Sequence, residues 1–146
     1  MNQEEAEYLI SALKELLSKT IEIPINGEKT TYDAVEINNI RNKFEIIIRR
    51  ANIKNDKCTF LVLTKDTKTC LMRLDTGDTL RHKNPNGQII HGTHLHTFKE
   101  GYESSYAIPF DIKNPNLVQY CIEFLKSINI INVEDISVIE KMTLFS

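Results

Sequence analysis

Apolar residues recur at helical spacing near both ends of the chain. Residues 3–18 place apolar side chains every three or four positions, which predicts an amphipathic N-terminal helix with Asn2 as its cap. A second such stretch covers residues 117–128, and we expect its helix to start at Pro115 with Asn114 as the cap. The two ends of the chain are therefore predicted to be helical.

In the middle of the chain, apolar positions recur with a period of two residues instead of 3.6. Apolar and polar residues alternate there in short runs, which is typical of β-strands. The predicted strands are residues 43–53, 58–64, 68–76, 93–99 and 105–112. The run 58–64 is apolar on both faces, so we expect it at the centre of the sheet.

Three further segments complete the pattern. An Asn26-Gly27 turn between two alternating runs predicts a hairpin over residues 21–37. Residues 132–140 suggest a short helix and residues 142–145 a last strand, while residues 76–90 resemble a long polar loop. The expected fold class is α+β, with a curved antiparallel sheet of five to seven strands packed against an N-terminal and a C-terminal helix.

Composition narrows the class of protein. A chain of 146 residues is expected to form a single domain, 1–146, and 41% hydrophobic with 26% charged residues is typical of globular proteins. No apolar run approaches the roughly 20 residues that span a bilayer, and the acidic start does not resemble a signal peptide. Three cysteines without paired spacing favour free thiols in a reducing compartment, so the expected location is cytoplasmic, with no membrane partner.

The net charge of −2 conceals a basic middle segment. Residues 41–103 carry 12 Lys and Arg against 7 Asp and Glu, whereas the flanks are acidic. Such a local excess of positive charge is suited to a phosphate-bearing partner, although it is equally typical of exposed strand edges.

All four histidines lie inside this basic segment, three of them in HGTHLHTF at residues 91–98. Strand alternation places His94, His96 and Phe98 on one face and Leu95 towards the core. His91 would reach the pair only through a bulge at Gly92, and His82 lies in the preceding loop. The histidines therefore mark a candidate site.

Three interpretations of this site remain open. The first is metal-independent cleavage of RNA, in which two histidines act as acid and base. The second is a surface that binds a partner without catalysis, and the third is a metal-binding hydrolase built on the His-x-His strand.

The nuclease interpretation gives each candidate residue a role. His94 and His96 would transfer protons, Tyr102 and His82 would assist them, and the cations Arg73, Arg81, Lys83 and Lys99 would hold the substrate's phosphates. No cofactor is needed. Arg73 and Asp75 share a strand face and are expected to form an ion pair.

The metal interpretation needs further ligands beside His94 and His96. His91 and Glu100 complete the expected set, with Asp75 and His82 as other candidates for a third ligand.

Four sequence blocks resemble an uncharacterised family, a domain of unknown function in small proteins of low-GC bacteria and their prophages. The blocks are Arg-Leu-Asp at 73–75, His82 with Asn-Pro-Asn-Gly at 84–87, the run from His94 to Tyr102, and Tyr-Ala-Ile-Pro at 106–109. They cover about the middle quarter of the chain. Asn86 stands where the family pattern has Asp, and Tyr106 where it has Trp.

The resemblance implies a setting on a prophage or another mobile element. In that setting we expect a toxin-like endoribonuclease that acts on RNA and is paired with an antitoxin. The alternative is a protein that binds and inhibits a host defence complex. The oligomeric state is left open, with a homodimer as one option.

Overall fold

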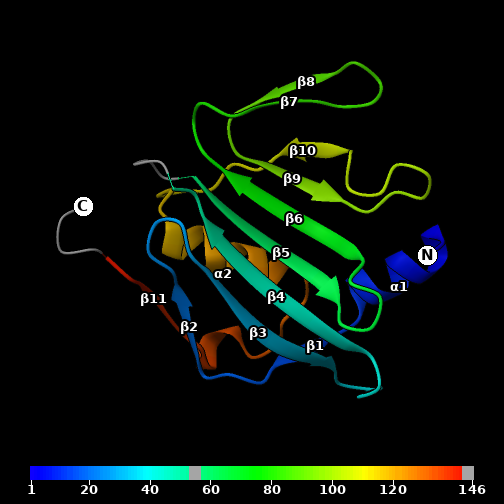
Figure 1. Cartoon of the computed structure of the whole chain (residues 1–146). Coiled ribbons are helices and arrows are strands. Elements are labelled where there is room, and N and C mark those ends of the chain that lie inside the picture. Colours follow the sequence, from blue (N-terminus) through cyan, green and yellow to red (C-terminus); the bar gives the residue numbers. More distant parts are fainter. Residues whose placement is uncertain (53–56, 143–146) are drawn as a thin grey trace.

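The structure is a computed structural model, and it describes residues 1–52 and 57–142. Its main element is a seven-stranded sheet in which all neighbouring strands are antiparallel (Figure 1). In spatial order the strands are β1 (Lys14–Leu16), β3 (Lys29–Glu36), β4 (Lys43–Arg50), β5 (Cys58–Thr64), β6 (Cys70–Thr76), β9 (His94–Thr97) and β10 (Ala107–Pro109). The α+β prediction is confirmed, and β5 lies at the centre of the sheet as its two apolar faces predict.

Helix α2 (Leu117–Ser127) covers one face of the sheet, and α1 (Gln3–Ser11) lies beside one end of it (Figure 1). The Phe124 ring of α2 packs against that of Phe60 in β5, with 6.1 Å between ring centroids. Alternate residues of the strands join this core, whereas their neighbours point to the opposite face. No helix within the described ranges is both long and apolar enough to cross a bilayer.

Both helices begin at an asparagine cap. The Asn2 side chain accepts a hydrogen bond from the Glu5 amide at 2.8 Å, which confirms the predicted cap of α1. The predicted cap of α2 is wrong. The side chain of Asn116, and not that of Asn114, accepts a hydrogen bond from the Gln119 amide in the first turn, at 2.8 Å. Asn114 has a left-handed φ of +52°, which an N-cap does not adopt.

Helix α1 ends seven residues before the predicted boundary because Lys14 enters the sheet as part of β1. Its fully buried ammonium group donates three hydrogen bonds of 2.9 Å to the carbonyls of Ile10, Ala12 and Ile128. These bonds satisfy carbonyl groups at the C-terminal ends of both helices, and the Ile10 carbonyl also accepts from the Asn129 side chain at 3.0 Å. Periodicity alone could not predict this buried lysine.

Two other predictions, the hairpin near the N-terminus and the short helix near the C-terminus, are also wrong. Strand β2 (Thr20–Ile23) does not form a hairpin with β3 but pairs in parallel with β11 (Ser137–Glu140). The predicted helix over 132–140 is reduced to one 3-10 turn, Val133–Asp135, and β11 follows it. Of the strand predicted at residues 142–145, Met142 is not in a strand, and residues 143–145 lie outside the described residues.

The predicted loop over residues 76–90 contains a further hairpin. Strands β7 (Arg81–Lys83) and β8 (Ile89–His91) pair with each other around the turn at residues 84–87, and Figure 1 shows them apart from the main sheet. The buried Asn84 fixes this hairpin to β10. Its side chain donates to the Ala107 carbonyl at 2.9 Å and accepts from the Ala107 amide at 2.8 Å.

Candidate functional site

The register of the sheet aligns polar residues in two rows on the face opposite α2. One row runs through Arg49, Thr59, Asp75 and His94, which are direct neighbours on β4, β5, β6 and β9. A second row, one pleat further, places Arg73 beside His96. Alternation along each strand keeps these residues on one face.

The two rows form the floor of a cavity of about 620 Å³. The hairpin contributes Leu80, Arg81 and His82 to its lining. The described residues that line the cavity include one carboxylate, that of Asp75. They also include five cationic side chains: Arg49, Arg50, Lys57, Arg73 and Arg81. The cavity is therefore strongly basic, as the charge of the middle segment predicts.

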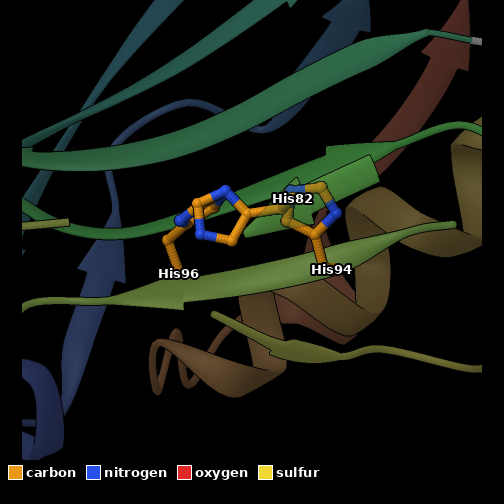
Figure 2. Close-up of side chains that lie close together, drawn as sticks. All are labelled: His82, His94 and His96. Atoms are coloured by element: carbon orange, nitrogen blue, oxygen red, sulfur yellow. The ribbon is translucent and has the colours of Figure 1, made fainter. Parts of the chain in front are cut away.

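Three imidazole rings meet in this cavity. His94 and His96 project from the same side of β9, and His82 reaches them from the hairpin (Figure 2). The ring centroids of His94 and His96 are 4.8 Å apart, and that of His82 lies 4.6 Å from His96 and 5.4 Å from His94. His94 and His96 are buried and His82 is half-buried.

Each ring is anchored to a backbone carbonyl through one nitrogen. Nδ1 of His94 donates to the Gly92 carbonyl at 2.8 Å, and Nδ1 of His96 donates to the Ser104 carbonyl at 2.7 Å. In His82 the donor is Nε2, which lies 2.8 Å from the Ser105 carbonyl. A carbonyl oxygen only accepts, so these bonds assign the proton of each neutral ring and leave its other nitrogen with a lone pair.

Asp75 and Arg73 connect the two rings of β9. Oδ2 of Asp75 lies 3.2 Å from Nε2 of His96 and 3.5 Å from Nε2 of His94. Nη2 of Arg73 lies 3.2 Å from the same carboxylate oxygen, which confirms the predicted ion pair, and 3.1 Å from Nε2 of His96. The other oxygen of Asp75 accepts a hydrogen bond from Thr59 at 3.1 Å.

These contacts separate the pKa values of the two histidines. The hydrogen bond to Asp75 raises the pKa of His94, while burial lowers the pKa of His96. Burial by itself would raise the pKa of Asp75, but its contacts with His94 and His96 and the charge of Arg73 outweigh burial and hold the pKa well below its usual range. The site therefore favours the charged form of His94 more than that of His96, and it keeps Asp75 ionised.

The same cluster has the composition of a metal site. The ligand nitrogens that His82, His94 and His96 can offer lie within 4.8 Å of one another. The set expected from sequence does not come together, because His91 is exposed on β8 and Glu100 bonds to the start of α1 through the Gln3 amide at 3.1 Å. His82 thus takes the place given to His91, and no bulge at Gly92 turns His91 inwards.

The structure places several other candidates outside the cavity. Tyr102 packs edge-on against Tyr106 at 5.1 Å, and the Lys99 ammonium lies 4.2 Å from the Tyr106 centroid. Neither Tyr102, Lys99 nor Lys83 lines the cavity. Phe98, expected beside His94 and His96, instead joins Leu95 in the core, since β9 ends at Thr97 and the alternation stops there.

Sequence reasoning missed the parts of the site that belong to the backbone. The carbonyls of Gly92, Ser104 and Ser105 orient the rings, yet carbonyls leave no signal in a sequence. It also missed Thr59 and Arg49, whose strand faces could have been predicted but whose neighbours across the sheet could not.

Comparison with known proteins gives a family and no activity. No curated protein and no solved structure is significantly similar to the chain. Residues 1–130 match the family of unknown function DUF6978, and the chain therefore belongs to that family.

Proposed function

We propose that the chain cleaves phosphodiester bonds in RNA, without a metal ion, and that His94 and His96 share the proton transfers. The observation that carries the proposal is the coincidence, in one basic cavity, of two adjoining imidazoles whose pKa values shift in opposite directions. Cleavage through the 2′-hydroxyl requires a base, an acid and a cation near the phosphate.

The charge of the cavity supports an anionic substrate. Arg49 and Arg81 are exposed at its lining and form no ion pair within the ranges that the structure describes. Each is therefore available for a phosphate oxygen, which the planar guanidinium group binds in bidentate fashion. A run of phosphates along one strand of RNA would satisfy both arginines.

His96 is the proposed base. Its Nδ1 proton is committed to the Ser104 carbonyl, so Nε2 carries the lone pair and accepts from Arg73 at 3.1 Å. When the guanidinium of Arg73 turns to the phosphate, Nε2 becomes free to take the proton of the 2′-hydroxyl. The 2′-oxygen then attacks the adjacent phosphorus.

His94 is the proposed acid. Asp75 stabilises its charged form, in which Nε2 carries a proton. As the bond from phosphorus to the 5′-oxygen breaks, that oxygen takes the proton from Nε2 of His94. The products are a 2′,3′-cyclic phosphate and a free 5′-hydroxyl, and Arg73 offsets the negative charge that builds on the phosphate oxygens.

The biological part of the proposal rests on the four sequence blocks described above. The nuclease would act in the cytoplasm as a toxin of a bacterial or prophage mobile element, with an antitoxin as its protein partner. Induced expression of the wild-type chain should then stop growth, and expression of the His96→Ala variant should not.

The direct test uses a DNA oligonucleotide that contains one ribonucleotide, incubated with the purified chain in excess chelator. Wild type should cut it at one position and leave a 2′,3′-cyclic phosphate, and the all-DNA oligonucleotide should stay intact. His94→Ala and His96→Ala should each lower the rate by about 10²–10⁴-fold, as general acid–base catalysis implies. His91→Ala is the matched control, since His91 is exposed on β8 and outside the cavity.

Three results would contradict the proposal. They are no cleavage by the wild type, cleavage of the all-DNA oligonucleotide, and His94→Ala or His96→Ala variants that are folded and as fast as the wild type. If the wild type binds RNA and leaves it intact, a binding function, such as inhibition of a host defence complex, replaces the nuclease.

A further inference from the structure

We infer that His82, His94, His96 and Asp75 form a Zn²⁺ site and that the bound ion switches the proposed nuclease off. The metal site stands on its own geometry, whereas the inhibition rests on the proposed function. The two can therefore fail separately.

The anchoring of the rings prepares them for a metal. Each of His82, His94 and His96 gives one N–H to a backbone carbonyl, at 2.7 to 2.8 Å. This pattern is the one found around metal-bound histidines, because the outer hydrogen bond fixes the ring and directs the remaining lone pair at the ion. Three rings with the same arrangement, drawn from two separate segments, exceed what packing alone requires.

The distances around Asp75 agree with tetrahedral coordination. Bonds of about 2.0 Å to a central Zn²⁺ place neighbouring ligand atoms about 3.3 Å apart. Oδ2 of Asp75 lies 3.2 Å from Nε2 of His96 and 3.5 Å from Nε2 of His94, so the carboxylate already has that spacing from both imidazoles. His82 offers the fourth ligand, within 4.8 Å of the other imidazole nitrogens.

The ligand atoms indicate which class of metal ion the site prefers. Imidazole nitrogens suit zinc, nickel and copper, whereas calcium and magnesium prefer oxygen ligands throughout. Three imidazoles and one carboxylate thus favour Zn²⁺ over the hard divalent cations.

Arg73 is the competitor of the ion. Its Nη2 lies 3.1 Å from Nε2 of His96 and 3.2 Å from Oδ2 of Asp75, close to where the metal would sit. Two positive charges at this spacing repel, so Zn²⁺ binds only when the guanidinium withdraws. The Arg73 side chain is 34% exposed and has room to turn towards the mouth of the cavity. Removal of its charge should therefore strengthen metal binding while it weakens cleavage.

Bound Zn²⁺ would disable both proton transfers. The lone pair of His96 that takes the 2′-hydroxyl proton would be bonded to the metal, and so would the nitrogen of His94 that carries the departing proton. The metal form of the protein cannot then act by the proposed route.

The test measures Zn²⁺ binding and RNA cleavage on the same full-length, chelator-stripped protein. We expect one Zn²⁺ per chain by calorimetry, binding at least tenfold weaker in His82→Ala, and no change in the His91→Ala control. Arg73→Gln should bind Zn²⁺ at least about threefold more tightly and cleave RNA more slowly, opposite shifts that a misfolded variant would not produce. Added Zn²⁺ should stop cleavage by the wild type, and chelator should restore it.

The outcomes separate the two ideas. Absence of Zn²⁺ binding, or binding that His82→Ala leaves unchanged, overturns the metal site and leaves the nuclease untouched. Cleavage that needs Zn²⁺ and disappears in chelator supports the site but overturns both the inhibition and the metal-independent reaction. Weaker Zn²⁺ binding in folded Arg73→Gln contradicts the competition with Arg73.

Discussion

Asn84 is predicted to hold the β7–β8 hairpin, and with it His82, against the edge of the main sheet. Its carboxamide pairs with the amide and the carbonyl of Ala107 at 2.8 and 2.9 Å, as a backbone residue of a neighbouring strand would. Both residues are buried, at 3% and 4% exposure, so water does not readily replace these bonds. Asn84→Ala removes the pair and keeps the backbone bonds of the turn.

The size of the effect follows from the two bonds. A net contribution of about 1 kcal/mol for each gives about 2 kcal/mol. Because 1.4 kcal/mol corresponds to a factor of ten, the opening equilibrium of the hairpin should increase about 30-fold. The loss of stability should be confined to the hairpin, because β7 and β8 lie outside the seven-stranded sheet.

Hydrogen exchange measures this opening directly. Backbone amides of β7 and β8 should exchange about 30-fold faster in Asn84→Ala, while those of the central strand β5 keep their rates. Asn86→Ala is the matched control, because Asn86 lies in the same turn but is exposed, and among the described residues its side chain bonds only to the nearby Gln88 amide, at 3.0 Å. Less than a threefold change for Asn84→Ala, or an equal change for Asn86→Ala, would refute the role given to the Ala107 contact.

Three further predictions concern stability and binding. Lys14→Met should lower the free energy of unfolding, measured in urea, by about 3 kcal/mol, because three carbonyls lose a buried donor. An unchanged urea midpoint would contradict this. Burial lowers the pKa of Lys14 to about 8, so the stability of the wild type relative to Lys14→Met should rise between pH 8 and 10.5, where only the unfolded chain keeps the proton. For RNA binding, the plot of log affinity against log salt should lose about 0.7 units of slope for each of Arg49→Ala and Arg81→Ala, and an unchanged slope would exclude phosphate contacts by that arginine.

Local pattern predicted the elements better than their ends. The strand at residues 58–64, apolar on both faces, and the Asn2 cap are both predicted correctly, because both depend on neighbours within a few positions. The predicted helix over residues 3–18 was too long because helical spacing continues past Ser11, while the buried ammonium of Lys14 draws the chain into β1. Residues 132–140 were misassigned for a similar reason, since pairing of β11 with the distant β2 decides their conformation.

The features of the candidate site also fall into those that depend on local sequence and those that depend on distant contacts. The sequence by itself determined that His94 and His96 share a face of one strand, that Arg73 and Asp75 share a face of another, and that both lie in a basic segment, because a period of two is a local property.

Only the tertiary structure decided that these two faces are adjacent and that His82, rather than His91, completes the cluster. Strand register and the docking of the hairpin depend on contacts between residues distant in the chain, and a sequence pattern carries no record of which partner each strand will meet.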